Sequence, residues 1–196
     1  MAGMGAKTRI LQLLNDAQDV GRAVAVYSDS EETSGYEVGF VGHVDGDHLT
    51  LNALTNRGEA DGMRYYSLDE IVRVDTETSY IARLELLYEY RESVFNFEFA
   101  KGPRGSQDLR GQLLHAQEMG TVIHLVDSGD VGPTGLVLSV GEDHVEIERL
   151  TSNGERDGRT VMLFEDIAKA HFGRKNEQVL GFLYRYHVGL KRLLES

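Results

Sequence analysis

The sequence predicts a mainly β protein with flanking helices, of the α+β class, built as two tandem five-stranded barrels. Three observations predict it. The 196-residue chain aligns with itself at a shift of 96 positions. Each copy contains short runs in which apolar and polar residues alternate, separated by Gly and Asp, which is typical of short strands. Apolar residues at helical spacing precede and follow these strands, so we expect an N-terminal and a C-terminal helix in each copy.

The internal repeat is the strongest of these observations. Positions 39–90 align with positions 135–186 without a gap, and 16 of the 52 pairs are identical. Upstream, Ala17–Gly21 matches Ala116–Gly120 at a shift of 99. The three-residue difference falls in the polar stretch 28–34, where a loop tolerates an insertion. One module has therefore been duplicated.

The first element of each copy is a short amphipathic helix. Leu11 and Leu14 contribute to its apolar face in the first copy, and Gly21 ends it. Leu113 and Gly120 have the same places in the second copy. A glycine directly after the last apolar residue of the pattern is a usual end of a helix.

Five short strands follow in each copy. The third is the clearest, since Leu49 and Leu51 alternate with Thr50 and Asn52. Five strongly bent strands usually close into a small barrel, because closure removes the edges of the sheet. The expected strands are 23–27, 36–44, 49–52, 63–66 and 71–74 in the first copy, and 122–126, 135–140, 145–148, 159–164 and 167–170 in the second.

A closing helix completes each copy. Val179, Leu183 and Tyr186 recur at helical spacing in the second copy, as Leu84 and Leu87 do in the first. Between the copies, residues 94–99 alternate like a further strand, and the Gly- and Pro-containing run 101–106 breaks the pattern. We therefore expect a first domain at 1–100, a linker at 101–106 and a second domain at 107–196.

Composition limits the function. The chain has no cysteine, which excludes disulfides, thiolate metal sites and a cysteine nucleophile and fits a reducing compartment. No apolar run approaches the length of a membrane span, and the first seven residues lack an apolar signal core, so a cytoplasmic protein is expected. The net charge is −12, of which −10 falls in residues 1–100. Proteins that bind DNA or RNA through the phosphate backbone need a cationic surplus, so this charge disfavours both.

The run Gly39–Asp45 (GFVGHVD), with its copy in Gly135–Val140, resembles the second strand of the Sm-like barrel family. Leu68–Val74 looks like the last two strands of that family. The resemblance implies an SH3-like small barrel in each copy, and it implies single-stranded RNA binding as one possible activity.

Two departures from the family pattern oppose RNA binding. Asp45 is followed by Gly46 and Asp47, with no Asn at the place where the family holds a base. Before the last strand the family has an Arg-Gly pair, whereas this chain has acids in both copies. These are Asp69, Glu70, Glu165 and Asp166.

The Asp-His pairs Asp47-His48 and Asp143-His144 recur in both copies. A His beside a carboxylate can bind a ligand or titrate near neutral pH. The preferred interpretation is a tight turn at the start of the third strand, in which the Asp side chain accepts backbone N–H bonds. One His and one Asp per copy are too few for a structural zinc site.

The runs Gly58–Gly62 and Gly154–Gly158 share the pattern Gly-Glu-x-Asp-Gly. Two glycines four apart favour a hairpin connection with positive φ. The alternative is a set of oxygen ligands or an acidic recognition loop. The candidate ligand-binding residues are therefore Asp47, His48, Glu59, Asp61, Asp143, His144, Glu155 and Asp157.

No nucleophile elbow, phosphate-binding loop, zinc-protease helix or dinucleotide fingerprint is present, so we predict no catalytic residues, no metal and no cofactor. The first hypothesis is a non-enzymatic binding or assembly module that takes a protein partner or a second copy. The alternatives are a single-stranded RNA-binding protein and a metal-dependent hydrolase. The hydrolase would use Asp47, His48, Glu59 and Asp61 with their copies.

Overall fold

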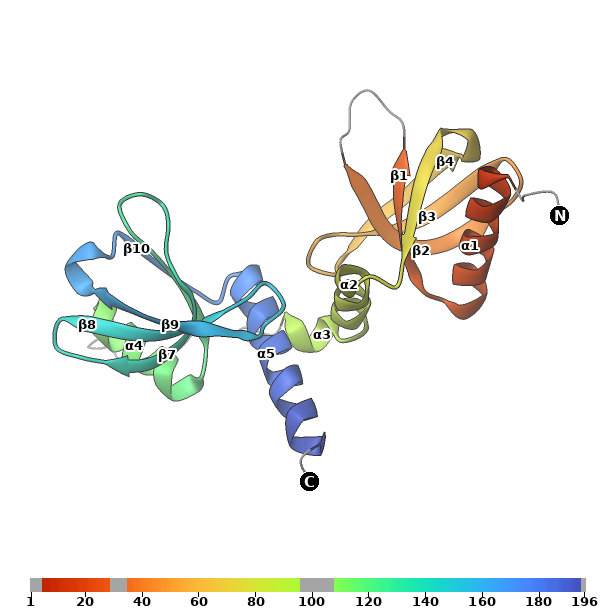
Figure 1. Ribbon diagram of the computed structural model, residues 1–196. Coiled ribbons are helices and arrows are strands. Elements are labelled where there is room, and N and C mark those ends of the chain that lie inside the picture. The colour runs from red at the N-terminus through yellow and green to blue at the C-terminus, as the bar shows by residue number, and fades with distance from the viewer. Residues whose placement is uncertain (1–4, 29–34, 96–107, 195–196) are drawn as a thin grey trace. The chain divides into compact units, whose positions relative to one another are not determined.

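The computed structural model describes residues 5–28, 35–95 and 108–194. The chain divides into two compact units, Met1–Arg91 and Glu92–Ser196. Each unit has its own five-stranded antiparallel sheet and its own hydrophobic core (Figure 1). The linker predicted at 101–106 lies outside the described residues.

The first unit has the strand order β4-β3-β2-β1-β5. Between β4 and β5 the chain makes one turn of 3-10 helix, η1, and the helix α2 closes the unit. Its elements are α1 (Ala6–Val20), β1 (Ala23–Ser28), β2 (Tyr36–Val44), β3 (His48–Leu54), β4 (Ala60–Ser67), η1 (Leu68–Glu70), β5 (Ile71–Thr76) and α2 (Ser79–Glu89). The short helix α3 (Arg91–Val94) lies at the boundary between the two units.

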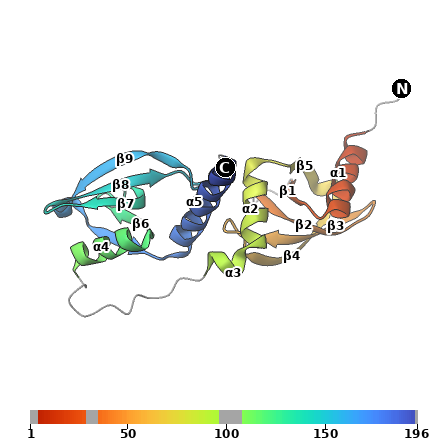
Figure 2. The same ribbon diagram turned by 90° about the horizontal axis from the view of Figure 1, so that it is seen from below.

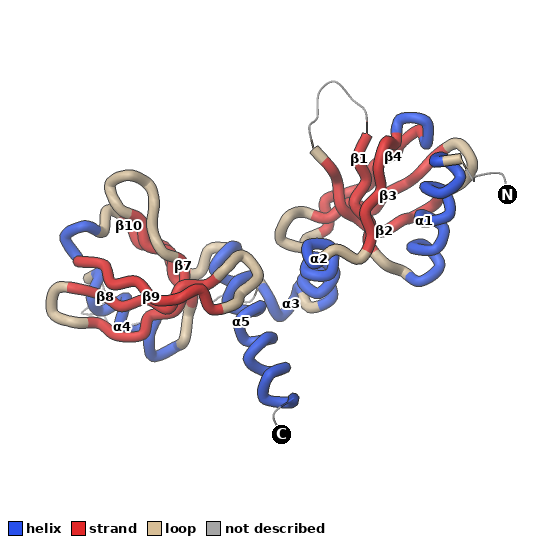
Figure 3. Tube along the Cα trace, in the orientation of Figure 1, coloured by secondary structure: helices blue, strands red, loops and turns tan. Residues whose placement is uncertain are grey.

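The second unit has the order β10-β6-β7-β8-β9, which is the same order counted along the repeat. Its elements are α4 (Leu109–Met119), β6 (Val122–Val126), β7 (Thr134–Val140), β8 (His144–Leu150), β9 (Arg156–Leu163), η3 (Phe164–Asp166), β10 (Lys169–Phe172) and α5 (Lys175–Leu194). Helices and strands therefore follow in the same sequence in both units (Figure 3).

The two sheets also share their register. Gly39 is opposite Ala53 in the first sheet, and Gly135 is opposite Arg149, 96 positions later, in the second. The register slips at Gly42 in the first sheet and at Leu138 in the second, again 96 positions apart. The repeat read from the sequence is therefore a repeat of strand pairing.

The glycine shared by β2 and β7 has a packing reason. A Cβ on Gly39 would lie 2.3 Å from the backbone oxygen of Asn52, and one on Gly135 would lie 1.9 Å from that of Glu148. Neither distance is possible for a real side chain, so both strands need glycine where the neighbouring backbone approaches.

Helices cover the first sheet at two places. The N-terminal helix α1 inserts Leu14 and Ala17 into a core with Leu49 and Leu51, and Gly21 ends it at φ 67°. The closing helix α2 packs elsewhere on the same unit, where the ring of Tyr88 lies 5.2 Å from that of Phe40. Figure 2 shows the strands of the first unit between these two helices.

The mainly β architecture with flanking helices is confirmed, with differences in detail. The last strand of the second unit begins at Lys169 rather than at 167, since two residues of irregular backbone, Ile167 and Ala168, follow η3 before the strand starts. The strand predicted at 94–99 is wrong at its start, since Val94 is the last residue of α3. Residues 96–99 lie outside the described part.

Candidate functional site

The Asp-His pairs lie at the corner between the second and third strands of each unit. The side chain of Asp45, not of Asp47, accepts the backbone N–H groups there: its Oδ1 lies 2.8 Å from the nitrogens of Asp47 and His48. These two hydrogen bonds lower the pKa of Asp45 below its ordinary value. The expected role of the Asp47 side chain is therefore wrong, because the carboxylate two residues earlier already caps the turn.

What the repeated Asp does in both units is done by its backbone. The carbonyl oxygen of Asp47 accepts a hydrogen bond from the nitrogen of Leu68 at 2.8 Å. That of Asp143 accepts one from the nitrogen of Phe164, also at 2.8 Å. The corner thus anchors the start of the 3-10 turn in each unit, which is a structural role.

The two histidines of these pairs have different partners. His48 stacks on Tyr65, with ring centroids 5.1 Å apart. His144 hydrogen-bonds through Nδ1 to Oδ1 of Asp143 at 2.8 Å, and its ring lies so close to Gly141 that a Cβ there would be 2.4 Å from it. The Asp-His pair is therefore repeated in the sequence, but its histidine contacts different groups in the two units.

The Gly-Glu-x-Asp-Gly runs form hairpins, as predicted. Gly58 has φ 73° and Gly154 has φ 77°. In each hairpin a threonine hydroxyl accepts the backbone N–H of the glutamate, at 3.1 Å between Thr55 and Glu59 and 3.2 Å between Thr151 and Glu155. The first glycine also packs against the closing helix, since a Cβ on Gly58 would lie 2.5 Å from the Cβ of Leu87.

The aspartates of these runs each bind an arginine, but not the same one. Oδ2 of Asp61 lies 3.2 Å from Nη2 of Arg64, three residues further along β4. Oδ2 of Asp157 lies 3.1 Å from Nη2 of Arg149, on the neighbouring strand β8. The pair of Asp61 and Arg64 belongs to a larger network.

The structure does not bring the predicted candidates of one unit together. Asp47 and His48 stand at the start of β3, while Glu59 and Asp61 follow its end. Seven residues of strand separate the two groups by about 20 Å. Within 5–28, 35–95 and 108–194, no three His, Asp or Glu side chains are arranged to hold a metal ion.

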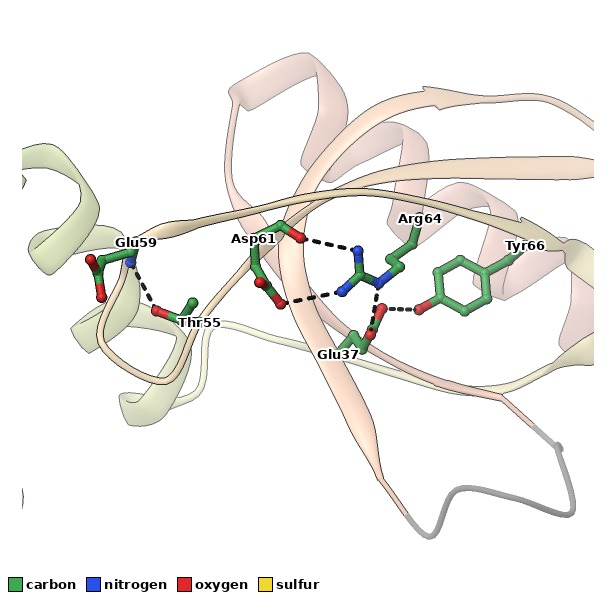
Figure 4. Close-up of polar contacts among 6 residues, drawn as sticks. All are labelled: Glu37, Thr55, Glu59, Asp61, Arg64 and Tyr66. Atoms are coloured by element: carbon green, nitrogen blue, oxygen red, sulfur yellow. Dashed lines mark hydrogen bonds and ion pairs between the residues drawn. The ribbon is translucent and has the colours of Figure 1, made fainter.

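A polar cluster that the sequence did not reveal joins Asp61 to β2 (Figure 4). Oε1 of Glu37 lies 3.0 Å from Nε of Arg64, and its other oxygen accepts the hydroxyl of Tyr66. Nη1 of Arg64 also donates to the backbone oxygen of Asp61 at 3.0 Å. Burial, and then the hydrogen bond to Glu37, raise the pKa of Tyr66 well above its ordinary value.

Beside this cluster the surface of the first unit is hollowed, over about 280 Å³. Tyr36 and Tyr80 stand at right angles there, at 86° with ring centroids 6.1 Å apart. The lining includes two carboxylates and no Lys or Arg. Its residues are Tyr36, Glu37, Val38, Ala53, Leu54, Thr55, Asn56, Asp61 and Tyr80. We name this feature the tyrosine hollow.

The second unit lacks the tyrosine hollow at the equivalent positions. Tyr36, Glu37, Arg64, Tyr66 and Tyr80 correspond to residues that are small, apolar or uncharged. These are Gly132, Pro133, Thr160, Met162 and Asn176, each 96 positions further on. The positions at which the two copies differ are therefore the sequence signal for the tyrosine hollow. The predicted site residues were instead taken from positions that are identical in both copies.

No described helix combines the length and the apolar character that crossing a membrane requires. The chain matches no protein-family model, no curated protein and no solved structure.

Proposed function

We propose that the chain is a non-enzymatic binding module of the cytoplasm, built from two Sm-like barrels, and that its tyrosine hollow binds a positively charged side chain of a protein partner. The observation that carries this proposal is the hollow itself: two tyrosine rings at right angles beside the carboxylates of Glu37 and Asp61. The absence of cysteine from the sequence fits the reducing compartment.

The chemistry of the lining favours a cation. A tyrosine face attracts an ammonium or guanidinium group, and a nearby carboxylate adds charge attraction. Guanidinium groups of the chain already use tyrosines in this region, with Arg73 4.4 Å from the ring centre of Tyr27 and Arg83 5.9 Å from that of Tyr80. The carboxylates of Glu37 and Asp61 already bind one guanidinium group, that of Arg64, which supports the same preference for a cation.

The charge of the first hundred residues supports a basic partner as well. They carry 8 Lys and Arg against 18 Asp and Glu, a net charge of −10. Such a surface draws a cationic partner toward it and repels polyanions. A basic segment of another protein therefore suits this unit better than RNA does.

The barrel part of the proposal rests on topology. In each unit the two outermost strands, β4 with β5 and β9 with β10, are consecutive in the chain and joined by a single turn of 3-10 helix. Bringing these two edges together would close the sheet and remove both edges. Nuclear Overhauser contacts between β4 and β5 test closure, and their absence from a well-resolved spectrum would show an open sheet.

Binding is tested by titrating the full chain into fluorescein-labelled lysine- and arginine-rich peptides and following anisotropy at two salt concentrations. We expect binding that weakens with added salt and drops at least tenfold in Tyr80→Ala and in Asp61→Asn. The matched control is Asp157→Asn, at the equivalent position of the second unit, which should bind like the parent.

Three further outcomes would contradict the proposal. No peptide binding at 100 µM protein would do so, and so would tighter binding to short uridine- or adenosine-rich RNA than to the peptides. Light scattering that shows a dimer dissociated by Tyr80→Ala would instead assign the hollow to a second copy of the chain.

A further inference from the structure

Two histidines face each other across the second sheet. His124 of β6 is paired with His171 of β10, and their rings are stacked, with centroids 5.7 Å apart and planes 21° from parallel. Both side chains are half-buried. Cross-strand neighbours on one face of a sheet are close enough for their side chains to share a ligand.

One of the rings is held by a hydrogen bond. Nδ1 of His124 lies 2.8 Å from the hydroxyl oxygen of Thr134, on β7. When Nδ1–H donates to that oxygen, Nε2 keeps its lone pair. A hydrogen bond from the second ring nitrogen to an oxygen is the usual support of a metal-binding imidazole.

A buried acid stands near the pair. Glu177, in the first turn of α5, is only 5% exposed, and its Oε2 has no hydrogen-bond partner within the described residues. Its side chain is close enough to His171 for the two groups to interact electrostatically.

Comparison of the two units shows that the scaffold does not require these residues. The positions of His124, His171 and Glu177 are taken in the first unit by Ala25, Asp75 and Ile81. Ile81 is 1% exposed, so the second unit buries a carboxyl group where the first buries an aliphatic side chain. Burying a carboxylate oxygen that has no hydrogen-bond partner costs stability, which points to a use for it.

We propose that His124 and His171 bind a divalent transition-metal ion through their imidazole nitrogens, with water completing the coordination and Glu177 contributing negative charge through its interaction with His171. Two protein ligands make an open site, weaker than the four-ligand sites of structural zinc. Imidazole suits Cu²⁺, Ni²⁺ and Zn²⁺, and Cu²⁺ should bind most tightly of the three.

The test is isothermal titration of the metal-free full chain with each of the three ions. We expect one Cu²⁺ site per chain that is lost, or weakened at least tenfold, in His124→Ala and in His171→Ala. The matched control is His115→Ala, which removes an exposed histidine of α4 and should leave the site unchanged. Thr134→Val keeps both imidazoles and should weaken binding about tenfold, as loss of a supporting hydrogen bond does.

Circular dichroism of each variant separates loss of the site from loss of the fold. Electron paramagnetic resonance of the Cu²⁺ form should show two nitrogen ligands in the parent and fewer in either histidine variant. The proposal is overturned if the parent takes up no Cu²⁺ at millimolar concentration, or if His115→Ala loses as much binding as His171→Ala does.

Discussion

Glu37 is the residue on which the polar cluster of the first unit depends. One of its oxygens accepts Nε of Arg64 and the other accepts the hydroxyl of Tyr66. In the second unit Pro133 takes the place of Glu37, and Met162 takes the place of Tyr66. Met162 packs against the core of its unit, as Tyr66 does in the first. The same scaffold therefore forms with or without the charges, which suits a cluster kept for binding.

Tyr66 gives this cluster a measurable dependence on pH. Its pKa is raised in the folded chain, so its contribution to stability is complete below the ordinary tyrosine value of about 10 and is lost as pH rises above that value. The variant Tyr66→Phe lacks the hydroxyl that bonds to Glu37, so we expect its free energy of unfolding to be about 1 kcal/mol lower at pH 7. We also expect that free energy to fall less steeply than it does in the parent above about pH 10, the ordinary tyrosine value.

Urea unfolding between pH 7 and pH 11 measures both effects. Tyr65→Phe serves as the control, because the neighbouring Tyr65 is 68% exposed and should leave the profile unchanged. An alkaline decline of equal slope in Tyr66→Phe and the parent would show that Tyr66 does not titrate as described.

At the scale of the element, the hairpins show how closely a glycine pattern can be read. Positive φ follows from the spacing of the glycines, and the structure has it at Gly58, Gly62, Gly154 and Gly158. The corner before β3 could not be read as well. Asp45 and Asp47 both suit a turn, and only the backbone path decides which carboxylate meets the N–H groups.

The hairpin glycines differ in what a side chain would meet. Gly58 has φ 73°, so Gly58→Ala strains the backbone, and the new Cβ would also lie 2.5 Å from the Cβ of Leu87 in α2. The two costs add. Gly62→Ala has the same kind of φ, 83°, but its nearest neighbour is the end of Arg64 at 3.6 Å. We expect losses of at least about 2 kcal/mol for the first and about 1 kcal/mol for the second.

Thermal and urea unfolding of the two variants measure this difference. Gly46→Ala is the neutral reference, since no atom lies within 4 Å of its Cβ and its φ is not positive. Equal losses for Gly58→Ala and Gly62→Ala would mean that α2 does not press on the hairpin.

At the scale of the whole molecule, alternation and helical spacing were enough to predict two equivalent sheets with flanking helices. They could not predict the tyrosine hollow, because its lining comes from β2, β3, the turn after β3, β4 and α2. Tyr36 and Tyr80 are 44 positions apart in the chain and have no common local pattern. Fold follows from periodicity within segments, whereas this site follows from contacts between them.

Two separate cores predict that damage stays within one unit. Leu51 and Ile147 are equivalent, and both are 0% exposed. We expect Leu51→Ala and Ile147→Ala each to cost about 2 to 5 kcal/mol in its own unit. Hydrogen exchange followed by mass spectrometry, peptide by peptide, should show faster exchange in the mutated unit alone. Equal acceleration in both would mean that the cores unfold as one.

The shared register of the two sheets creates a hazard while the chain folds. A strand of one unit has the register and bulge needed to enter the sheet of the other, and such exchange is a common failure of tandem domains. The residues that differ between the units work against it. A β7 placed in the first sheet would set Pro133, the residue before it, where Arg64 and Tyr66 require Glu37. Arg64 would then keep Asp61 as a partner, and the hydroxyl of Tyr66 would lose its acceptor. The sequence differences between the two copies therefore also disfavour the exchange of strands between the units.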